Sequence, residues 1–414
     1  MNIAYRSRLI ISFLLPLGIV ALSGCGSESG VQFKTNRLYL TKLTNANDPL
    51  QPQQIEDIVN TVTALFGTPD EPYFVADGDL AVEEILEVEN LAVSAGPITR
   101  NNFGKGVGLY RQHCVHCHGV SGDGEGPTAP FLNPYPRDFR RGTFKFKSTP
   151  IGSKPTTEDL QRVVTHGVAG TAMPAFNAIL KDGEIEAIVD YVKYLSIRGE
   201  TERLLMDYQF NEADYEDPES RDDFLSRDFL VSTVAEVLDA WREAPEMVKE
   251  VEERPAEYDR WSPDFDEVAL GKSIKRGQAL YFGSGTCVKC HGPSQLGDGQ
   301  VTDYDVWSKE LHDWAAGAKD EVYEQHLAQH NELTPLKLRN IRPRNLRRGV
   351  YRGGRRPIDI FWRVRNGIDG TPMPAASSVI SDADVWDIVN YVLAIPYEGI
   401  SRPDHEIAYT RERQ

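Results

Sequence analysis

Apolar residues form one continuous run near the start of the chain and recur at helical spacing further along it. The run spans residues 9–22, fourteen mostly apolar positions behind Arg6 and Arg8, and it is shorter than the ~18 residues that a membrane-spanning helix needs. Basic residues before a short apolar run are typical of a secretory signal peptide. We therefore expect residues 1–24 to be a signal that directs export.

Amphipathic helices are predicted in the segment that follows. From residue 52 to residue 66 the apolar positions fall on one helical face, and the Gly-Thr-Pro-Asp sequence at 67–70 ends the pattern. A second short helical pattern lies near residues 80–91, whereas residues 26–48 are polar and are expected to be extended.

The most informative pattern is an internal repeat, because residues 104–196 and 275–396 contain the same landmarks in the same order. Each copy has a Cys-x-x-Cys-His-Gly motif, a Pro-Arg pair, a Gly-Thr-x-Met-Pro segment and a closing apolar helix. These landmarks begin at residues 114, 136, 170 and 185 in the first copy and at residues 287, 343, 370 and 385 in the second. Two homologous helical domains are the simplest explanation.

A strongly acidic connector separates the two copies. Residues 203–264 contain 19 acidic and 7 basic residues. Apolar residues at helical spacing between Phe229 and Trp241 predict at least one amphipathic helix that packs on a neighbour. A disordered acidic spacer is the alternative, and it is best suited to residues 211–223.

Four of the five cysteines lie in the two Cys-x-x-Cys-His motifs: Cys114, Cys117, Cys287 and Cys290. This motif is typical of c-type haem attachment. Two thiols three positions apart on a turn reach the two vinyl groups of one haem, and the next residue, His118 or His291, is placed to bind the iron. A zinc site formed by both cysteine pairs and a redox-active dithiol are the alternatives.

Because of these motifs, each copy resembles a class I cytochrome c domain. In that family a Gly-x-x-x-aromatic pair opens an N-terminal helix that crosses the C-terminal helix at a contact only glycine allows; Gly106 with Tyr110 and Gly277 with Tyr281 match it. The resemblance implies an all-α fold with two tandem domains, joined by the partly helical connector, and two covalently bound haem c groups. Gly283 and Gly285 flank an insertion before Cys287, which implies a looser turn there.

The expected organisation follows from this resemblance. We predict a lipoprotein-type signal peptide (1–24), an N-terminal segment with short helices (25–96), cytochrome c domain 1 (97–200), the acidic connector (201–266), cytochrome c domain 2 (267–400) with an insertion at 301–336, and a tail (401–414).

Methionine is the expected sixth ligand of each iron. Only Met173 and Met373 occupy equivalent positions in the two copies, each inside a Gly-Thr-x-Met-Pro turn. Histidine and methionine ligation favours ferrous iron, raises the reduction potential and leaves no open position for oxygen or peroxide. The chain is therefore expected to carry single electrons and to have no catalytic residues.

The family also uses a proline carbonyl to orient the ligating histidine through its second ring nitrogen. The repeat comparison selects Pro136 and its counterpart Pro343 for this role. The arginine groups that begin at Arg137 and Arg344 are expected to bind haem propionates.

Residues 22–25, Leu-Ser-Gly-Cys, resemble the lipobox of bacterial lipoproteins, which implies a lipid anchor on Cys25. An ordinary cleavage site with an incidental cysteine is the alternative. Gly26 after the cysteine implies an outer-membrane destination where the cell has one, with the protein facing the periplasm.

The net charge of −17 excludes non-specific binding to nucleic acid, because phosphate would repel such a chain. One segment opposes this trend: residues 337–356 contain one lysine, eight arginines and no acid. This basic segment is interpreted either as a docking surface for an acidic partner or as charge compensation for propionates. His312, His326 and His330 have no counterparts in the first copy; a solvated helix face is their simpler explanation and a metal site the alternative.

Taken together, the residues predict an exported dihaem carrier at a membrane surface. Its expected partners are a quinol-oxidising complex, a dehydrogenase or a terminal oxidase of which it is a subunit. A dihaem peroxidase is the alternative from another class, and it would require one haem that can open its sixth position.

Overall fold

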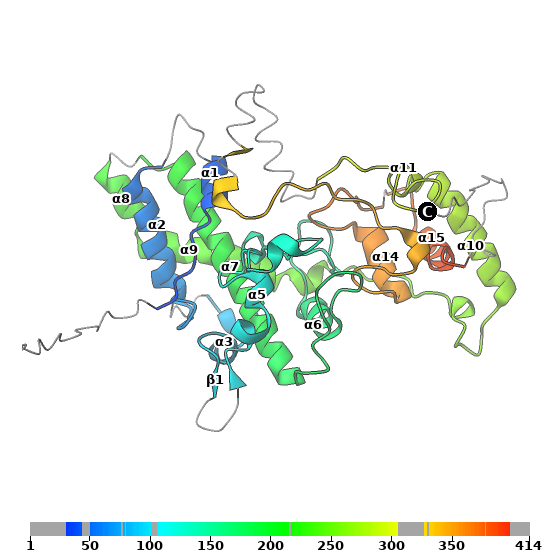
Figure 1. Ribbon diagram of the computed structural model, residues 1–414, viewed down its shortest axis with the longest axis horizontal. Coiled ribbons are helices and arrows are strands. Elements are labelled where there is room, and N and C mark those ends of the chain that lie inside the picture. Colours follow the sequence, from blue (N-terminus) through cyan, green and yellow to red (C-terminus); the bar gives the residue numbers. More distant parts are fainter. Residues whose placement is uncertain are drawn as a thin grey trace, which may run out of the picture.

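The computed structural model describes residues 30–43, 50–75, 78, 80–100, 106–214, 217–304, 327–328, 331–376 and 378–397. The predicted signal peptide, the predicted lipid-attachment residue Cys25 and the predicted C-terminal tail lie outside these ranges. Most of the 301–336 insertion, including its three histidines, also lies outside them. Figure 1 shows the elements that are described.

The described regular structure is almost entirely helical, which confirms the all-α prediction. The α-helices are α1 (Arg37–Leu43), α2 (Pro52–Phe66), α3 (Val88–Ser94), α4 (Leu109–His113), α5 (Val115–His118), α6 (Thr157–His166), α7 (Asp182–Asn211), α8 (Pro218–Phe224), α9 (Arg227–Arg242), α10 (Glu267–Phe282), α11 (Val288–His291), α14 (Pro357–Asn366) and α15 (Asp382–Ala394). Short 3-10 turns include Phe139–Arg141 and its counterpart Leu346–Arg348. A two-stranded antiparallel ribbon, β1 (Thr99–Arg100) and β2 (Gly106–Val107), interrupts the first repeat.

Helix α7 organises the first half of the molecule. It is 30 residues long and runs without a break across the predicted domain boundary at residue 200. Its first half closes the first repeat, and its second half continues into a helical layer formed by α1, α2, α8 and α9 (Figure 1). None of the described helices is both long and apolar enough to cross a bilayer.

That layer joins the N-terminal segment to the acidic connector through polar contacts, most of them buried. The Gln54 side-chain amide donates to Gln209 Oε1 (3.1 Å), and the Asn36 backbone N–H donates to Glu202 Oε1 (3.0 Å). Arg221 of α8 pairs with Asp57 of α2 at 2.8 Å. These pairs hold the connector against the N-terminal helices.

The amphipathic helix predicted in the connector is confirmed as α9, whose apolar side includes the buried Val234, Leu238 and Trp241. The alternative of a disordered spacer over 211–223 is wrong for residues 218–223, which lie in α8. The extended conformation expected before residue 48 is likewise wrong for residues 37–43, which form α1. Both helices are short, and partners distant in sequence stabilise them.

The second repeat has the expected crossing of its first and last helices. In α10, Gly277 packs so closely on α15 that a Cβ in its place would overlap the carbonyl oxygen of Asp387. Arg276 reinforces the crossing with an ion pair to Asp387 at 2.6 Å.

The corresponding crossing predicted for Gly106 is wrong. Gly106 lies in β2, where it pairs with Arg100, and α4 begins only at Leu109. Helix α3 packs against α7 instead, and Asn90 of α3 donates to Asp190 Oδ2 of α7 at 2.7 Å. In this repeat two short helices, α3 and α4, take the place of a single first helix, and the ribbon of β1 and β2 lies between them.

Candidate functional site

The two Cys-x-x-Cys-His segments adopt the same local structure. Each forms a single helical turn, α5 or α11, in which the histidine N–H donates to the carbonyl of the first cysteine at 2.9 Å. The preceding tyrosine hydroxyl donates to the glycine carbonyl after the histidine, at 2.9 Å from Tyr110 and 2.8 Å from Tyr281. The extra residues before Cys287 are absorbed ahead of this turn, so the motif itself is unchanged.

None of the four motif cysteines forms a disulfide. Burial raises the pKa of Cys114 to about 12 and that of Cys287 to about 11. A redox-active dithiol requires the opposite shift, toward a stable thiolate. Within the described ranges, no three His, Cys, Asp or Glu side chains come together as metal ligands, so the two cysteine pairs do not combine into one zinc site.

Both histidines that follow the cysteines are uncharged, and one ring nitrogen of each has a backbone partner. Burial lowers the pKa of His118 to about 4, and it also lowers the pKa of His291. In each ring Nδ1 lies 3.1 Å from a backbone carbonyl oxygen, of Arg137 for His118 and of Arg344 for His291. Since a carbonyl only accepts, Nδ1 carries the proton and Nε2 keeps its lone pair for a metal.

The accepting carbonyl is one residue later than predicted. Pro136 and Pro343 were expected to supply it, but their carbonyl oxygens face the glycine loops at Gly124 and Gly297. A Cβ at Gly124 would lie 2.8 Å from the Pro136 oxygen, and one at Gly297 would overlap the Pro343 oxygen. Successive peptides in an extended segment point in opposite directions, so the next carbonyl faces the histidine.

The two methionine turns are equally alike. Thr171 Oγ1 accepts a hydrogen bond from the Met173 N–H at 3.1 Å, and Thr371 Oγ1 accepts one from the Met373 N–H at 3.2 Å. Each methionine carbonyl also accepts from the residue before the turn at 3.1 Å, from Val168 or Ile368. Met173 packs against the buried cluster that contains Cys114.

The sites differ beside the histidine. The His118 ring stacks on Phe139, with ring centroids 4.6 Å apart and planes inclined by 17°. Sequence reasoning did not identify Phe139, although its place in the repeated Pro-Arg segment, opposite Leu346 in the second copy, was a usable signal.

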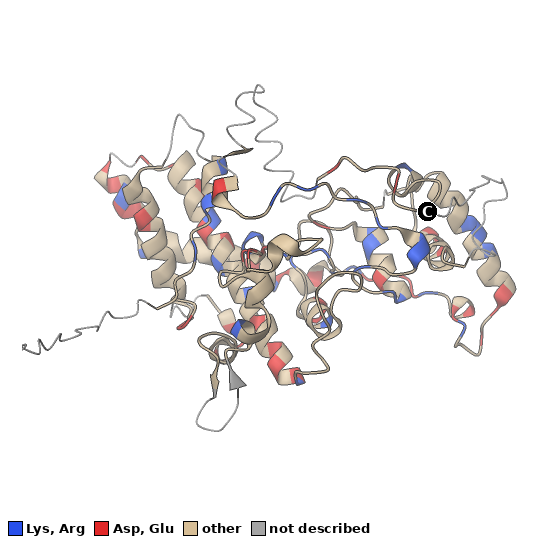
Figure 2. Ribbon diagram, viewed as in Figure 1, with Lys and Arg blue, Asp and Glu red and all other residues tan. Residues whose placement is uncertain are grey.

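Most of the arginines expected near propionates or at a docking surface already have protein partners. Arg140 forms a buried pair with Asp138 at 2.9 Å, and Arg347 donates to Gln295 Oε1 at 2.8 Å. Arg339 donates to the carbonyls of Pro130 and Leu132 in the first repeat. The basic segment 337–356 (Figure 2) therefore contributes to the structure as well as to the surface, where Lys337, Arg342, Arg348, Arg355 and Arg356 remain exposed.

These residues fit a covalently bound haem in each repeat. None of the four thiols is in a disulfide, the histidines are neutral with Nδ1 occupied, and a methionine follows in a hydrogen-bonded turn. Large apolar side chains are also exposed in the segments that follow the first motif and the two methionine turns, with Phe131 at 86%, Ile179 at 63% and its counterpart Val379 at 78%.

Comparison with known proteins agrees with this description. The family described as cytochrome c oxidase, cbb3-type, subunit III matches residues 101–192 and 272–392, together just over half of the chain. Among solved structures, a chain of the reducing HAO-like protein complex of Kuenenia stuttgartiensis is 24% identical, with 72% of this chain and 98% of that chain covered and a TM-score of 0.39. No curated protein matches the chain.

Proposed function

The chain belongs to the family of subunit III of cbb3-type cytochrome c oxidases and is a c-type cytochrome, and from this we propose that it is a dihaem electron carrier. The proposal assigns one haem to each repeat, with domain 1 at 97–200 and domain 2 at 267–400. The observation that carries it is the duplication of the complete ligand set, with the same hydrogen bonds in both copies.

Each residue of the set has a separate role in the proposal. Cys114 and Cys117 in the first repeat, and Cys287 and Cys290 in the second, hold the haem through thioether bonds. His118 and His291 bind iron through Nε2, while the carbonyls that accept from Nδ1 fix the orientation of the rings. Met173 and Met373 would each supply a thioether ligand to the iron of their own repeat.

The bound haem supplies a one-electron couple between ferric and ferrous iron. We expect the ligands to move little between the two oxidation states, because hydrogen bonds fix the backbone of each methionine turn and a backbone carbonyl orients each histidine. Small ligand movement favours fast electron transfer over substrate chemistry.

The partners in this proposal are membrane-associated respiratory proteins: a quinol-oxidising complex, a dehydrogenase or a terminal oxidase. The family supports the last of these most directly, because its description names an oxidase subunit. In this proposal, a lipid on Cys25 holds the chain at the membrane surface beside these partners.

A reductive titration distinguishes this carrier from a dihaem peroxidase. We expect two haems per purified chain, both low-spin at every stage of reduction, and no turnover of hydrogen peroxide, because each iron retains a methionine ligand. Peroxide turnover, with one high-spin haem in the half-reduced protein, would establish the peroxidase instead.

Replacing Cys25 with alanine is expected to release the protein from membranes without changing its haem content. The reason is that a thioether-linked lipid on Cys25 would be the anchor, whereas the haem cysteines are far away in sequence. Fractionation of cells into membrane and periplasmic extracts measures the change, with Ser29→Ala as the matched control. Continued membrane association of the Cys25→Ala protein would exclude the anchor.

A further inference from the structure

The methionine turn of each repeat is covered by an arginine of the other repeat. In the first repeat, a Cβ at Gly170 would overlap a guanidinium nitrogen of Arg344. In the second repeat, a Cβ at Gly370 would lie 3.2 Å and 3.5 Å from the two terminal nitrogens of Arg137. Both glycines have positive φ, 72° and 70°, so the turns themselves have the same backbone conformation.

The two contacts involve corresponding positions of the two repeats. Arg137 and Arg344 both follow the repeated proline, and Gly170 and Gly370 both begin the repeated methionine turn. The second neighbour is equivalent as well, since Thr143 lies 3.5 Å from the Cβ position of Gly370 and Val350 lies 3.2 Å from that of Gly170. Reciprocal contacts of this kind define a two-fold interface between homologous units.

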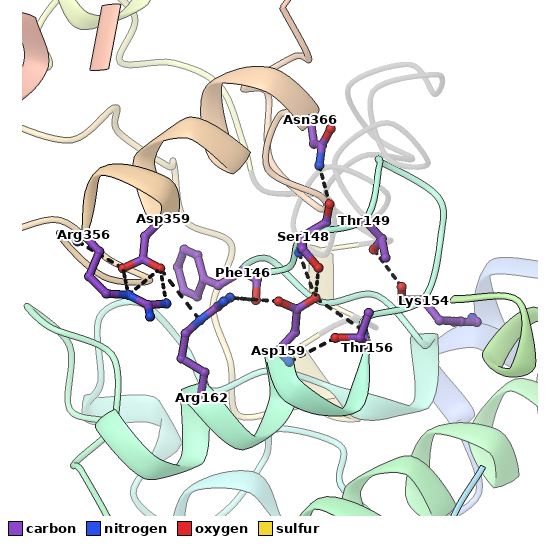
Figure 3. A network of polar contacts seen from close by, with 10 residues as sticks. All are labelled: Phe146, Ser148, Thr149, Lys154, Thr156, Asp159, Arg162, Arg356, Asp359 and Asn366. Atoms are coloured by element: carbon purple, nitrogen blue, oxygen red, sulfur yellow. Dashed lines mark hydrogen bonds and ion pairs between the residues drawn. The ribbon is translucent and has the colours of Figure 1, made fainter. Parts of the chain in front are cut away.

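Further contacts hold the two repeats in this arrangement (Figure 3). Asn366 of α14 donates to the Ser148 carbonyl at 2.7 Å, and Arg162 of α6 lies 4.0 Å from Asp359 at the start of α14. Lys147 and Asp369 form an ion pair at 2.9 Å in which both side chains are largely buried.

The same two arginines also hold the iron-binding histidines. The carbonyl of Arg137 accepts from His118, and that of Arg344 accepts from His291, each at 3.1 Å. Arg137 is therefore bound to the histidine of the first site by its backbone and lies against the methionine turn of the second site by its side chain. Arg344 makes the opposite connection.

We propose that Arg137 and Arg344 are exchanged positioning residues, each of which supports the methionine ligand of the other repeat and so couples the two haem sites. This inference rests on the proposed function, because it requires Met173 and Met373 to be ligands. Its physical basis is steric: a guanidinium that fills the space beside a glycine in the left-handed conformation limits how far that turn can shift.

If the two sites are coupled in this way, substitution of an arginine in one repeat should weaken the methionine ligation in the other repeat and not in its own. Substitution of either side chain leaves its carbonyl in place, so the histidine of its own repeat remains oriented. Removal of the Arg137 guanidinium is expected to loosen the turn of Met373, and removal of the Arg344 guanidinium is expected to loosen the turn of Met173.

Two backgrounds isolate the sites for the test. Ferric haem with a methionine ligand has a weak long-wavelength absorption band that bis-histidine haem lacks, so Met173→His leaves only the band of the second site and Met373→His only that of the first. Arg137→Gln, Arg344→Gln and the control Arg342→Gln, an exposed arginine of the basic segment, are then made in each background.

In the Met173→His background we expect Arg137→Gln to abolish the band or reduce it strongly, and Arg344→Gln and Arg342→Gln to leave it unchanged. In the Met373→His background the effects of Arg137→Gln and Arg344→Gln should be reversed. Haem content, measured on every variant, confirms that it has folded. Arg137→Lys and Arg344→Lys, which keep the charge but lose the planar group, should reduce the band partially.

A change of the methionine band only in the arginine's own repeat, or in neither repeat, would refute the proposal that the two arginines support each other's methionine turn. Either result would leave the proposed carrier function unaffected. Failure of the proposed function gives a different result, because the single Met→His backgrounds would then show no loss of band before any arginine is changed.

Discussion

Replacing Met373 with histidine is expected to leave the haem attached and to lower the potential of one haem by a few hundred millivolts, within the roughly 0.8 V range that axial ligands span. The thioether stabilises ferrous iron, and imidazole does so less. Met173→His should lower the potential of the other haem. Spectroelectrochemical titration of the two variants measures both changes.

Met247→Leu is the matched control for this experiment. Met247 is 40% exposed in the connector and has no counterpart in either repeat, so both potentials should match those of the unmodified protein. Unchanged potentials in Met173→His or Met373→His would refute the assignment of that methionine as a ligand.

Introducing alanine at Gly277 should destabilise the second repeat by about 3 kcal/mol, the upper part of the usual range for an overpacked core. The added methyl group would overlap the backbone of Asp387 where α10 crosses α15, and a backbone atom cannot move aside without separating the helices. Hydrogen exchange of the α10 and α15 amides measures the change in opening free energy directly.

Gly271→Ala provides a control in the same helix. A Cβ at Gly271 meets no atom within 4 Å, and alanine is favoured over glycine in a helix by about 1 kcal/mol, so protection should stay the same or rise. Equal exchange rates in Gly277→Ala and the unmodified protein would show that this crossing is not tightly packed.

The sequence predicted helices well where a segment contains its own start, apolar face and end. Helix α2 has the bounds expected, because Pro52 begins it, one face is apolar and Gly67 ends it. Helices α1 and α8 were missed because they are short and because contacts such as that of Arg221 with Asp57 stabilise them from elsewhere in the chain. Local patterns do not contain that information.

In the candidate site, too, the sequence predicts some features and not others. Comparison of the two copies selects the cysteine, histidine and methionine residues, because their chemistry requires those residue types at that spacing. It does not show which peptide faces a histidine, so Pro136 was chosen where the structure uses the carbonyl of Arg137. Backbone orientation depends on the neighbouring Gly124 loop, and residue type alone does not specify it.

The Gly106 prediction failed for a related reason. Its spacing to Tyr110 is that of the family, but Gly106 itself lies in a two-stranded ribbon, and α3 packs against α7 instead. The arginines that cross between the repeats were also not visible in sequence, because that contact joins segments more than 170 residues apart.

Haem content combined with near-infrared magnetic circular dichroism of the oxidised protein tests the central claim most directly, since it counts the haems and identifies the ligand pair of each iron. We predict two covalently bound haems per chain, both low-spin with histidine and methionine ligands. A single haem, or a second haem that is high-spin or has two histidine ligands, would contradict the account.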